Sequence, residues 1–140
     1  MVFFDNNATT PLGKNVLDAY KIALKQNWQN PSSPYRESAH TRALLEKVRF
    51  EIATSFGLRK NELIFTSGAT ESNNAVFAHL GKSIKSKSGC LISPFEHSSV
   101  IESAKYWFEG RIHFMPTNEE GFVDSDRVQD ILNANDICLV

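Results

Sequence analysis

The sequence has few cysteines and no long apolar run, and each absence excludes a class of protein. Only Cys90 and Cys138 are cysteines among 140 residues, which excludes a dense disulfide framework. No spacing of cysteine and histidine resembles a zinc site, so we expect no bound metal. No apolar stretch approaches the roughly 20 residues that a membrane span requires.

The sequence also lacks an excess of charge of either sign. Because 15 Lys and Arg nearly balance 16 Asp and Glu, we expect neither nucleic acid nor a membrane surface as a partner. No basic segment followed by an apolar run is found at the N-terminus, which indicates no signal peptide. We therefore expect a cytoplasmic protein.

The first 60 residues read as loops and helices. Apolar residues at helical spacing predict one helix after Pro11 and a longer one that Gly57 ends. Polar and proline-containing stretches predict loops at residues 5–11 and 29–34. We interpret residues 1–60 as an N-terminal segment of helices and loops.

From residue 61 onward, short apolar runs alternate with helical patterns. Strands are predicted at residues 63–65, 90–93, 112–115 and 136–140, with helices between them. This alternation predicts a mainly parallel α/β sheet with right-handed crossovers, in which both cysteines are buried strand thiols. A Lys/Ser tract at residues 82–88 predicts a solvated connection. Because the chain stops inside the last predicted strand, we interpret residues 61–140 as an incomplete α/β domain.

Two segments of this region carry candidate chemistry. Residues 66–71, TSGATE, follow a predicted strand and open a helix, where backbone N–H groups and the Thr70 hydroxyl suit a phosphate. A capped helix start without a ligand explains the same hexapeptide. His97 follows the next strand, so it is expected at the same edge of the sheet, where an imidazole can stack on a cofactor and exchange protons. An ordinary helix-start histidine is the alternative.

Two polar loops in the first 60 residues admit two interpretations. The DNNATTP loop at residues 5–11 and the NPSS loop at residues 30–33 have amide and hydroxyl side chains suited to a substrate carboxylate. The same residue types commonly build turns and helix caps.

Taken together, these segments resemble the cysteine desulfurases, pyridoxal-phosphate (PLP) enzymes of fold type I grouped with the class-V aminotransferases. The resemblance covers the whole chain. It is carried in order by DNNATTP, NPSS, TSGATESNN, EHSSV and the later PTNEEGFVD at residues 116–124. It departs from the family pattern at Tyr35 and Ser38, where a histidine and a glycine are usual.

The resemblance implies a cofactor and roles for five residues. Ala69 and Thr70 are expected to hold the PLP phosphate, and His97 is expected to stack on the pyridine ring and act as a catalytic group. Asn6 and Asn7 are expected near the substrate. The resemblance places the Schiff-base lysine, the aspartate that pairs with the pyridine nitrogen and the nucleophilic cysteine beyond Val140. The 140 residues alone are therefore expected to be inactive.

The resemblance also implies a reaction and partners. The family converts L-cysteine to L-alanine with a persulfide on an enzyme cysteine. It implies a homodimer that passes sulfur to acceptor proteins, such as those of iron–sulfur cluster biogenesis. A selenocysteine lyase or another class-V enzyme is the first alternative. A non-catalytic piece that needs a second chain is the other.

Overall fold

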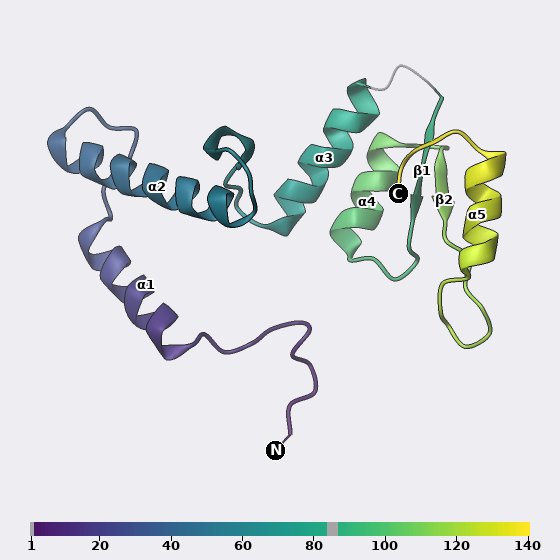
Figure 1. Ribbon diagram of the computed structural model, residues 1–140, viewed down its shortest axis with the longest axis horizontal. Helices are drawn as coiled ribbons and strands as arrows, with labels where there is room; N and C mark the ends of the chain where they lie inside the picture. Colours follow the sequence, from purple (N-terminus) through teal and green to yellow (C-terminus); the bar gives the residue numbers. More distant parts are fainter. Residues whose placement is uncertain (1, 84–86) are drawn as a thin grey trace. The chain divides into compact units, whose positions relative to one another are not determined.

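The computed structural model describes residues 2–83 and 87–140 and contains two compact units, Met1–Ile64 and Phe65–Val140 (Figure 1). The domain boundary predicted after residue 60 stays a prediction. Of the solvated connection predicted at residues 82–88, residues 84–86 lie outside the described part of the chain.

The first unit contains the two predicted helices, which are confirmed. They are α1 (Lys14–Gln26) and α2 (Arg36–Ser55), followed by the short 3-10 helix η1 (Lys60–Glu62). Gly57 ends α2 as predicted, with a φ of 69°. The N–H of Leu58 donates to Ala53 O at 2.9 Å and that of Gly57 donates to Thr54 O at 3.0 Å. This pair of bonds is a Schellman motif, which favours glycine because only glycine adopts positive φ without strain.

The strand predicted at residues 63–65 is wrong. These residues follow η1 without regular secondary structure and belong to no strand of the described sheet, and Ile64 is 80% exposed. A short apolar run predicts a strand only if a neighbouring strand hydrogen-bonds to it. In the described residues the sheet begins at Gly89.

The second unit alternates helices and strands, which confirms the predicted α/β class. Its elements are α3 (Ala69–Ser83), β1 (Gly89–Ile92), α4 (Ser98–Trp107), β2 (Ile112–Phe114), α5 (Ser125–Ala134) and β3 (Ile137–Leu139). The strand order is β2-β1-β3, and β1 pairs in parallel with both neighbours. The three helices predicted between the strands coincide with α3, α4 and α5, and the three later predicted strands coincide with β1, β2 and β3.

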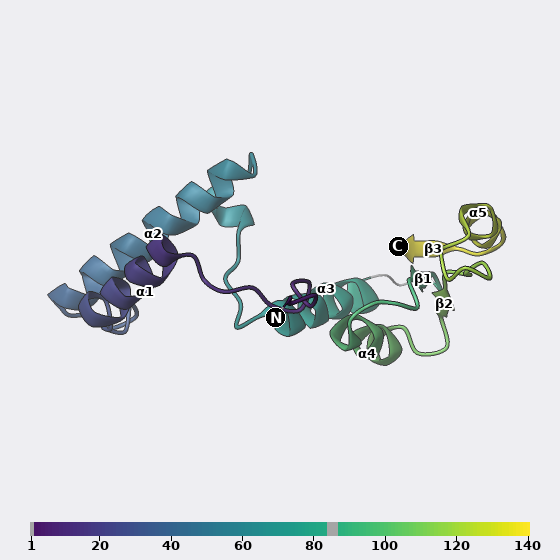
Figure 2. The same ribbon diagram turned by 90° about the horizontal axis from the view of Figure 1, so that it is seen from below.

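Helices cover both faces of this sheet. In Figures 1 and 2, α3 and α4 lie on one side of the strands and α5 lies on the other. The step from β1 to β2 and the step from β2 to β3 run in opposite directions across the sheet. Crossovers of one hand must then place α4 and α5 on opposite faces.

The core of the second unit lies between β1 and the α3–α4 layer. It is formed by Phe77, Cys90, Ile92, Ala104 and Phe108. The rings of the two phenylalanines meet edge to face, with centroids 6.1 Å apart. All four residues of β1 are buried, as expected for the central strand of a covered parallel sheet.

The cysteines behave as strand residues. Cys90 is fully buried, as predicted, whereas Cys138 is only half-buried and its thiol donates to Gly89 O at 3.2 Å. Burial, with a smaller contribution from the nearby Cys138, raises the pKa of the Cys90 thiol to about 11. A thiol with so little thiolate is a poor nucleophile.

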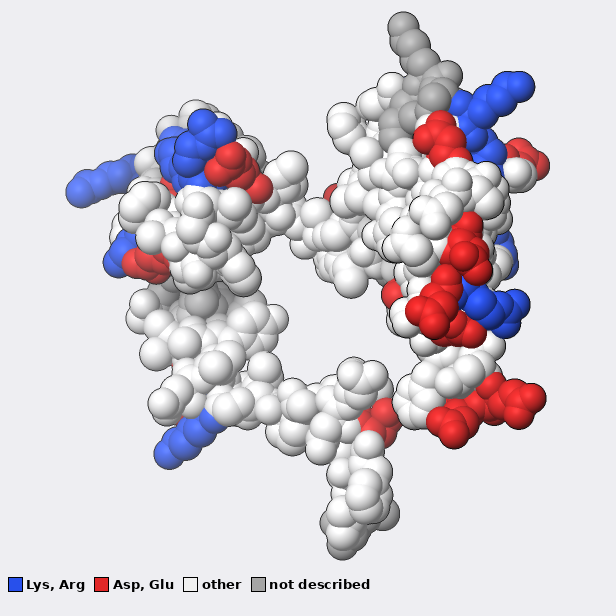
Figure 3. Space-filling model, turned by 45° about the vertical axis from the view of Figure 1, so that its right-hand side comes forward, with Lys and Arg blue, Asp and Glu red and all other residues white. Residues whose placement is uncertain are grey.

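The surface carries charges of both signs. On the face in Figure 3, basic and acidic side chains are interspersed over a mostly uncharged surface. Ion pairs within residues 2–83 and 87–140 join side chains of opposite sign, most of them three or four residues apart along the chain. No helix in residues 2–83 and 87–140 has both the length and the apolar character to span a bilayer.

Candidate functional site

The starts of α3 and α4 lie at one end of the second unit. Figure 1 shows the two helices side by side, both beginning at the end where the chain leaves β1. The two helices are joined directly near their starts, because Asn73 Nδ2 donates to Ser99 Oγ at 2.9 Å. The structure therefore brings the TSGATE segment and His97 to the same end of the sheet, which is the carboxyl end of β1. Ligands of open α/β sheets bind at such edges.

The start of α3 presents backbone donors. The helix begins at Ala69, and its first backbone hydrogen bond runs from the N–H of Ser72 to Gly68 O at 3.2 Å. The N–H groups of Ala69, Thr70 and Glu71 have no acceptor within the helix, because the first turn of any α-helix lacks one. The helix dipole adds partial positive charge at the same place.

The Glu71 carboxylate fixes the loop that precedes these donors. Its Oε2 accepts from both the backbone N–H and the hydroxyl of Ser67, each at 2.7 Å. These two hydrogen bonds, the backbone one first, lower the pKa of Glu71 below its usual range. The negatively charged carboxylate of Glu71 is thereby bound to the loop residue Ser67.

Thr70 has the hydroxyl in this segment that is available to a ligand. The Thr66 and Ser72 hydroxyls lie 2.7 Å apart and bond to each other, and the Ser67 hydroxyl is bound to Glu71. In the described part of the chain the exposed Thr70 hydroxyl makes no hydrogen bond. Three backbone N–H groups and one hydroxyl are the donor set that suits a phosphate, so these residues fit the PLP phosphate that the sequence predicts.

His97 is the N-cap of α4. Its Nδ1 accepts from the Ser99 N–H at 3.1 Å and lies 2.9 Å from Ser99 Oγ. The residue is exposed, so its ring has a surface open to a ligand. His97 is thus both a helix-start histidine and a neighbour of the α3 start, and the two interpretations of the sequence are compatible.

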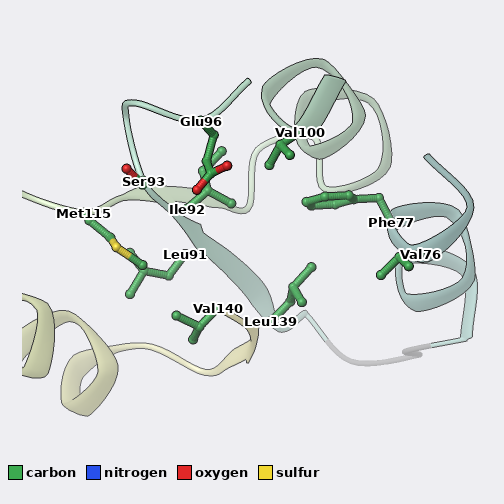
Figure 4. A pocket seen from close by; sticks show the side chains of 10 residues that line it. All are labelled: Val76, Phe77, Leu91, Ile92, Ser93, Glu96, Val100, Met115, Leu139 and Val140. Carbon is green, nitrogen blue, oxygen red and sulfur yellow. The ribbon is translucent and has the colours of Figure 1, made fainter. Parts of the chain in front are cut away.

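A cavity of about 230 Å³ adjoins this end of the sheet (Figure 4). Apolar side chains from α3, α4, β1 and β3 line most of it, and the polar contributions come from Ser93 and Glu96, in the loop between β1 and His97. Neither Thr70 nor His97 lines this cavity. The predicted cofactor contacts therefore belong to the exposed surface formed by the starts of α3 and α4.

The polar loops belong to the first unit. Asn30 Oδ1 accepts from the Ser32 N–H at 2.9 Å, which is an Asx turn and agrees with the turn-forming interpretation of the NPSS loop. Asn6 and Asn7 lie in an exposed turn that the N–H of Ala8 closes onto Asp5 O at 3.1 Å. Their approach to a substrate stays a prediction.

The two departures from the family pattern differ in their surroundings. Tyr35 is exposed and precedes α2, whereas Ser38 is fully buried in its first turn. The Ser38 hydroxyl has no hydrogen-bond partner among the described residues. A glycine at this position would bury no hydroxyl.

Sequence reasoning missed Asn73, Ser99 and Glu71 as parts of this site. A signal was present for Glu71, because an acidic residue soon after a serine is typical of helix starts. The bond between Asn73 and Ser99 spans 26 positions and depends on how α3 packs against α4. No local pattern predicts such a contact.

The whole chain is similar to known proteins of one family. Residues 2–140 match the family model described as Aminotransferase class-V. The cysteine desulfurase IscS of Dictyoglomus turgidum is 38% identical over 99% of this chain and 36% of its own length. The IscS of Methanosarcina thermophila is 30% identical over 99% of this chain and 35% of its own length.

Two solved structures are also similar. A NifS-like protein is 28% identical, with a TM-score of 0.77 over 93% of this chain and 36% of that one. A structure described as SspA in complex with cysteine is 27% identical, with a TM-score of 0.68 over 88% of this chain and 36% of that one. This chain spans about a third of the length of the relatives it matches.

Proposed function

This chain belongs to the class-V aminotransferase family, and we propose that it forms the phosphate-binding and ring-facing part of a PLP-dependent cysteine desulfurase. The observation that carries the proposal is the shared position of Thr70 and His97. Thr70 lies in the first turn of α3 and His97 directly precedes α4, and the bond between Asn73 and Ser99 joins these two helices near their starts. The relatives named as cysteine desulfurases support the choice of reaction.

The start of α3 would hold the phosphate of PLP. Ala69 and Thr70 would donate their backbone N–H groups, and the Thr70 hydroxyl would donate a further hydrogen bond. The positive end of the helix dipole favours the dianion. When bound, PLP supplies an electron sink for bonds around the α-carbon of an amino acid.

His97 would stack on the pyridine ring and transfer protons during the reaction. Its Nδ1 is engaged by Ser99, so Nε2 is the nitrogen with which the ring would meet a ligand. Proton transfer by a positioned imidazole is effective near neutral pH. Cys90 is unsuited to the role of nucleophile, because its thiol is fully buried and its pKa is raised.

The proposed substrate is L-cysteine, and the products are L-alanine and sulfur held as a persulfide. A similar structure is described as a complex with cysteine, which supports this substrate. We further propose that the complete protein acts as a homodimer in the cytoplasm and passes sulfur to acceptor proteins, including those of iron–sulfur cluster biogenesis.

A ligand titration tests the phosphate site. Inorganic phosphate and PLP are added separately to the chain while the backbone amide signals of Ala69 and Thr70 are followed by NMR. Both ligands should shift these signals. Thr70→Val should weaken phosphate binding about tenfold or more, because a hydrogen bond to a charged group is lost, and Thr70→Ser should restore it. Without the lysine expected beyond Val140, PLP binding should be weak.

Two results would refute the phosphate site. One is the absence of any shift at Ala69 and Thr70 with millimolar PLP. The other is equal affinity of wild type and Thr70→Val for both ligands. A tight, coloured PLP complex of these 140 residues would contradict the predicted location of the Schiff-base lysine.

The product of the whole gene tests the reaction. Given L-cysteine and a reductant, it should form L-alanine and sulfide in equal amounts. A parallel assay with L-selenocysteine separates a selenocysteine lyase from a desulfurase. If alanine forms only after a second polypeptide is added, the chain is instead a piece that requires complementation. A protein without PLP absorbance and without either product would exclude the proposed activity.

A further inference from the structure

Ser99 contacts both His97 and Asn73. Its backbone N–H donates to His97 Nδ1 at 3.1 Å, and its Oγ lies 2.9 Å from the same nitrogen. The Asn73 amide donates to Ser99 Oγ at 2.9 Å. Ser99 is only 8% exposed, so water competes poorly for these bonds.

The directions of these hydrogen bonds determine where the imidazole proton lies. A backbone N–H can only donate, so His97 Nδ1 must accept. A ring nitrogen that accepts carries no proton, and the neutral imidazole then has its proton on Nε2. Because Ser99 Oγ accepts from Asn73, its own hydrogen is free to point at Nδ1. Each residue thus donates a hydrogen bond to the next, from Asn73 to Ser99 and from Ser99 to His97, and we call this chain of hydrogen bonds the relay.

We infer that Ser99 and Asn73 are positioning residues that hold the His97 ring by Nδ1 and leave Nε2 as the protonated nitrogen that meets the cofactor or substrate. The catalytic consequence rests on the proposed function, whereas the relay itself is independent of it.

The relay also couples the two halves of the site. Asn73 lies three residues after Thr70, which places both on neighbouring positions of one face of α3. The ring of His97 is thus fixed to the helix whose start would hold the phosphate. A shift of α3 relative to α4 would break the bond between Asn73 and Ser99 and release the ring.

The tautomer of His97 tests this inference without any ligand. Nitrogen-15 NMR of the imidazole rings is recorded at about pH 8.5, where histidine side chains are neutral. The signals of His97 are assigned by their loss in His97→Gln. In the wild type, the Nε2–H form should dominate.

Three variants carry the test. Ser99→Ala removes the hydroxyl and should lower the ratio of the Nε2–H form to the Nδ1–H form about tenfold, the usual equivalent of one hydrogen bond. Asn73→Asp supplies an acceptor in place of the donor, so the Ser99 hydrogen turns away from His97 and the ratio should fall similarly. Ser98→Ala is the matched control, because this exposed neighbour makes no hydrogen bond through its hydroxyl in the described residues.

The outcomes separate the relay from the proposed function. A ratio in Ser99→Ala within twofold of the wild type, or a wild type mainly in the Nδ1–H form, overturns the inference. Asn73→Asp keeps the test decisive if Ser99→Ala does not fold, since Asn73 is only half-buried. If the ratios respond as expected but PLP leaves the Ala69 and Thr70 amides unshifted, the relay stands and the proposed function fails.

Discussion

Gly89 is the position where one added methyl group should most disturb the second unit. An alanine Cβ there would lie 2.5 Å from the Arg111 carbonyl oxygen and 3.2 Å from His113 Cδ2. Relief requires β1 and the Arg111 backbone to separate by about half an ångström or more. The bond from the Cys90 N–H to the same oxygen, now 2.9 Å, would lengthen beyond the normal range.

Gly89→Ala should therefore lower the free energy of unfolding by about 3 kcal/mol, from overpacking of about 2 kcal/mol and a weakened hydrogen bond of about 1 kcal/mol. Thermal unfolding followed by circular dichroism should show a Tm lower by about 10 °C. Gly68→Ala is the matched control, because a Cβ there meets nothing within 4 Å. Equal Tm values for the two variants would show that β1 does not approach Arg111 so closely.

Three further predictions concern single side chains. At pH 8, Cys90 should react with iodoacetamide about 90-fold more slowly in the native protein than after unfolding, because burial raises its pKa from 9.0 to about 11. Similar rates measured by mass spectrometry would contradict its burial. Since folding raises this pKa, the associated stability should be present below about pH 9 and be lost as the pH rises toward 11, which unfolding in urea across that range would detect. Ser38→Ala should raise the free energy of unfolding by about 1 kcal/mol by removing a buried hydroxyl without a partner among the described residues, and a lower Tm would refute this. Folding lowers the pKa of Glu71, so its hydrogen bonds to Ser67 should persist at pH values below the usual carboxyl pKa and break only as the pH falls through the lower folded value. A carbon-13 NMR titration of the Glu71 carboxyl with an ordinary midpoint would contradict these hydrogen bonds.

The elements that the sequence predicted correctly are those with a local cause. Helix α2 ends where Gly57 allows a positive φ, and β1 is apolar throughout because both of its faces are covered. The resemblance to the class-V family is also confirmed by the match of residues 2–140 to the family model. It could be seen in the sequence because each motif that carries it is a short continuous segment. The strand predicted at residues 63–65 is wrong because a strand needs a second strand to hydrogen-bond with, and that partner comes from elsewhere in the chain. The apolar run itself does not show whether such a partner is present.

The candidate site divides in the same way. Placement of His97 at this edge follows from the order of β1 and α4, so sequence was sufficient for it. Thr70 was predicted there from a strand at residues 63–65 that does not form, and it lies there because α3 packs beside α4. The hydrogen-bonding state of His97 was not accessible, because it is determined by Ser99 and, through Ser99, by Asn73 on another helix. Packing between α3 and α4 decides that contact.

The helix starts of the second unit show how stability and ligand binding are distributed. Helices α4 and α5 begin with side-chain caps, His97 accepting from the Ser99 N–H and Asp124 from the Arg127 N–H. Helix α3 begins after Gly68, which has no side chain to accept from the first turn. A serine or aspartate there would add about 0.3 kcal/mol of cap stability, but its oxygen would occupy the donors that a phosphate needs. Glu71 stabilises the same start from within the helix by binding Ser67, and that bond leaves the N–H groups of Ala69 and Thr70 open. The geometry thus combines an ordered loop with free donors, which is the combination that an anion site at a helix start requires.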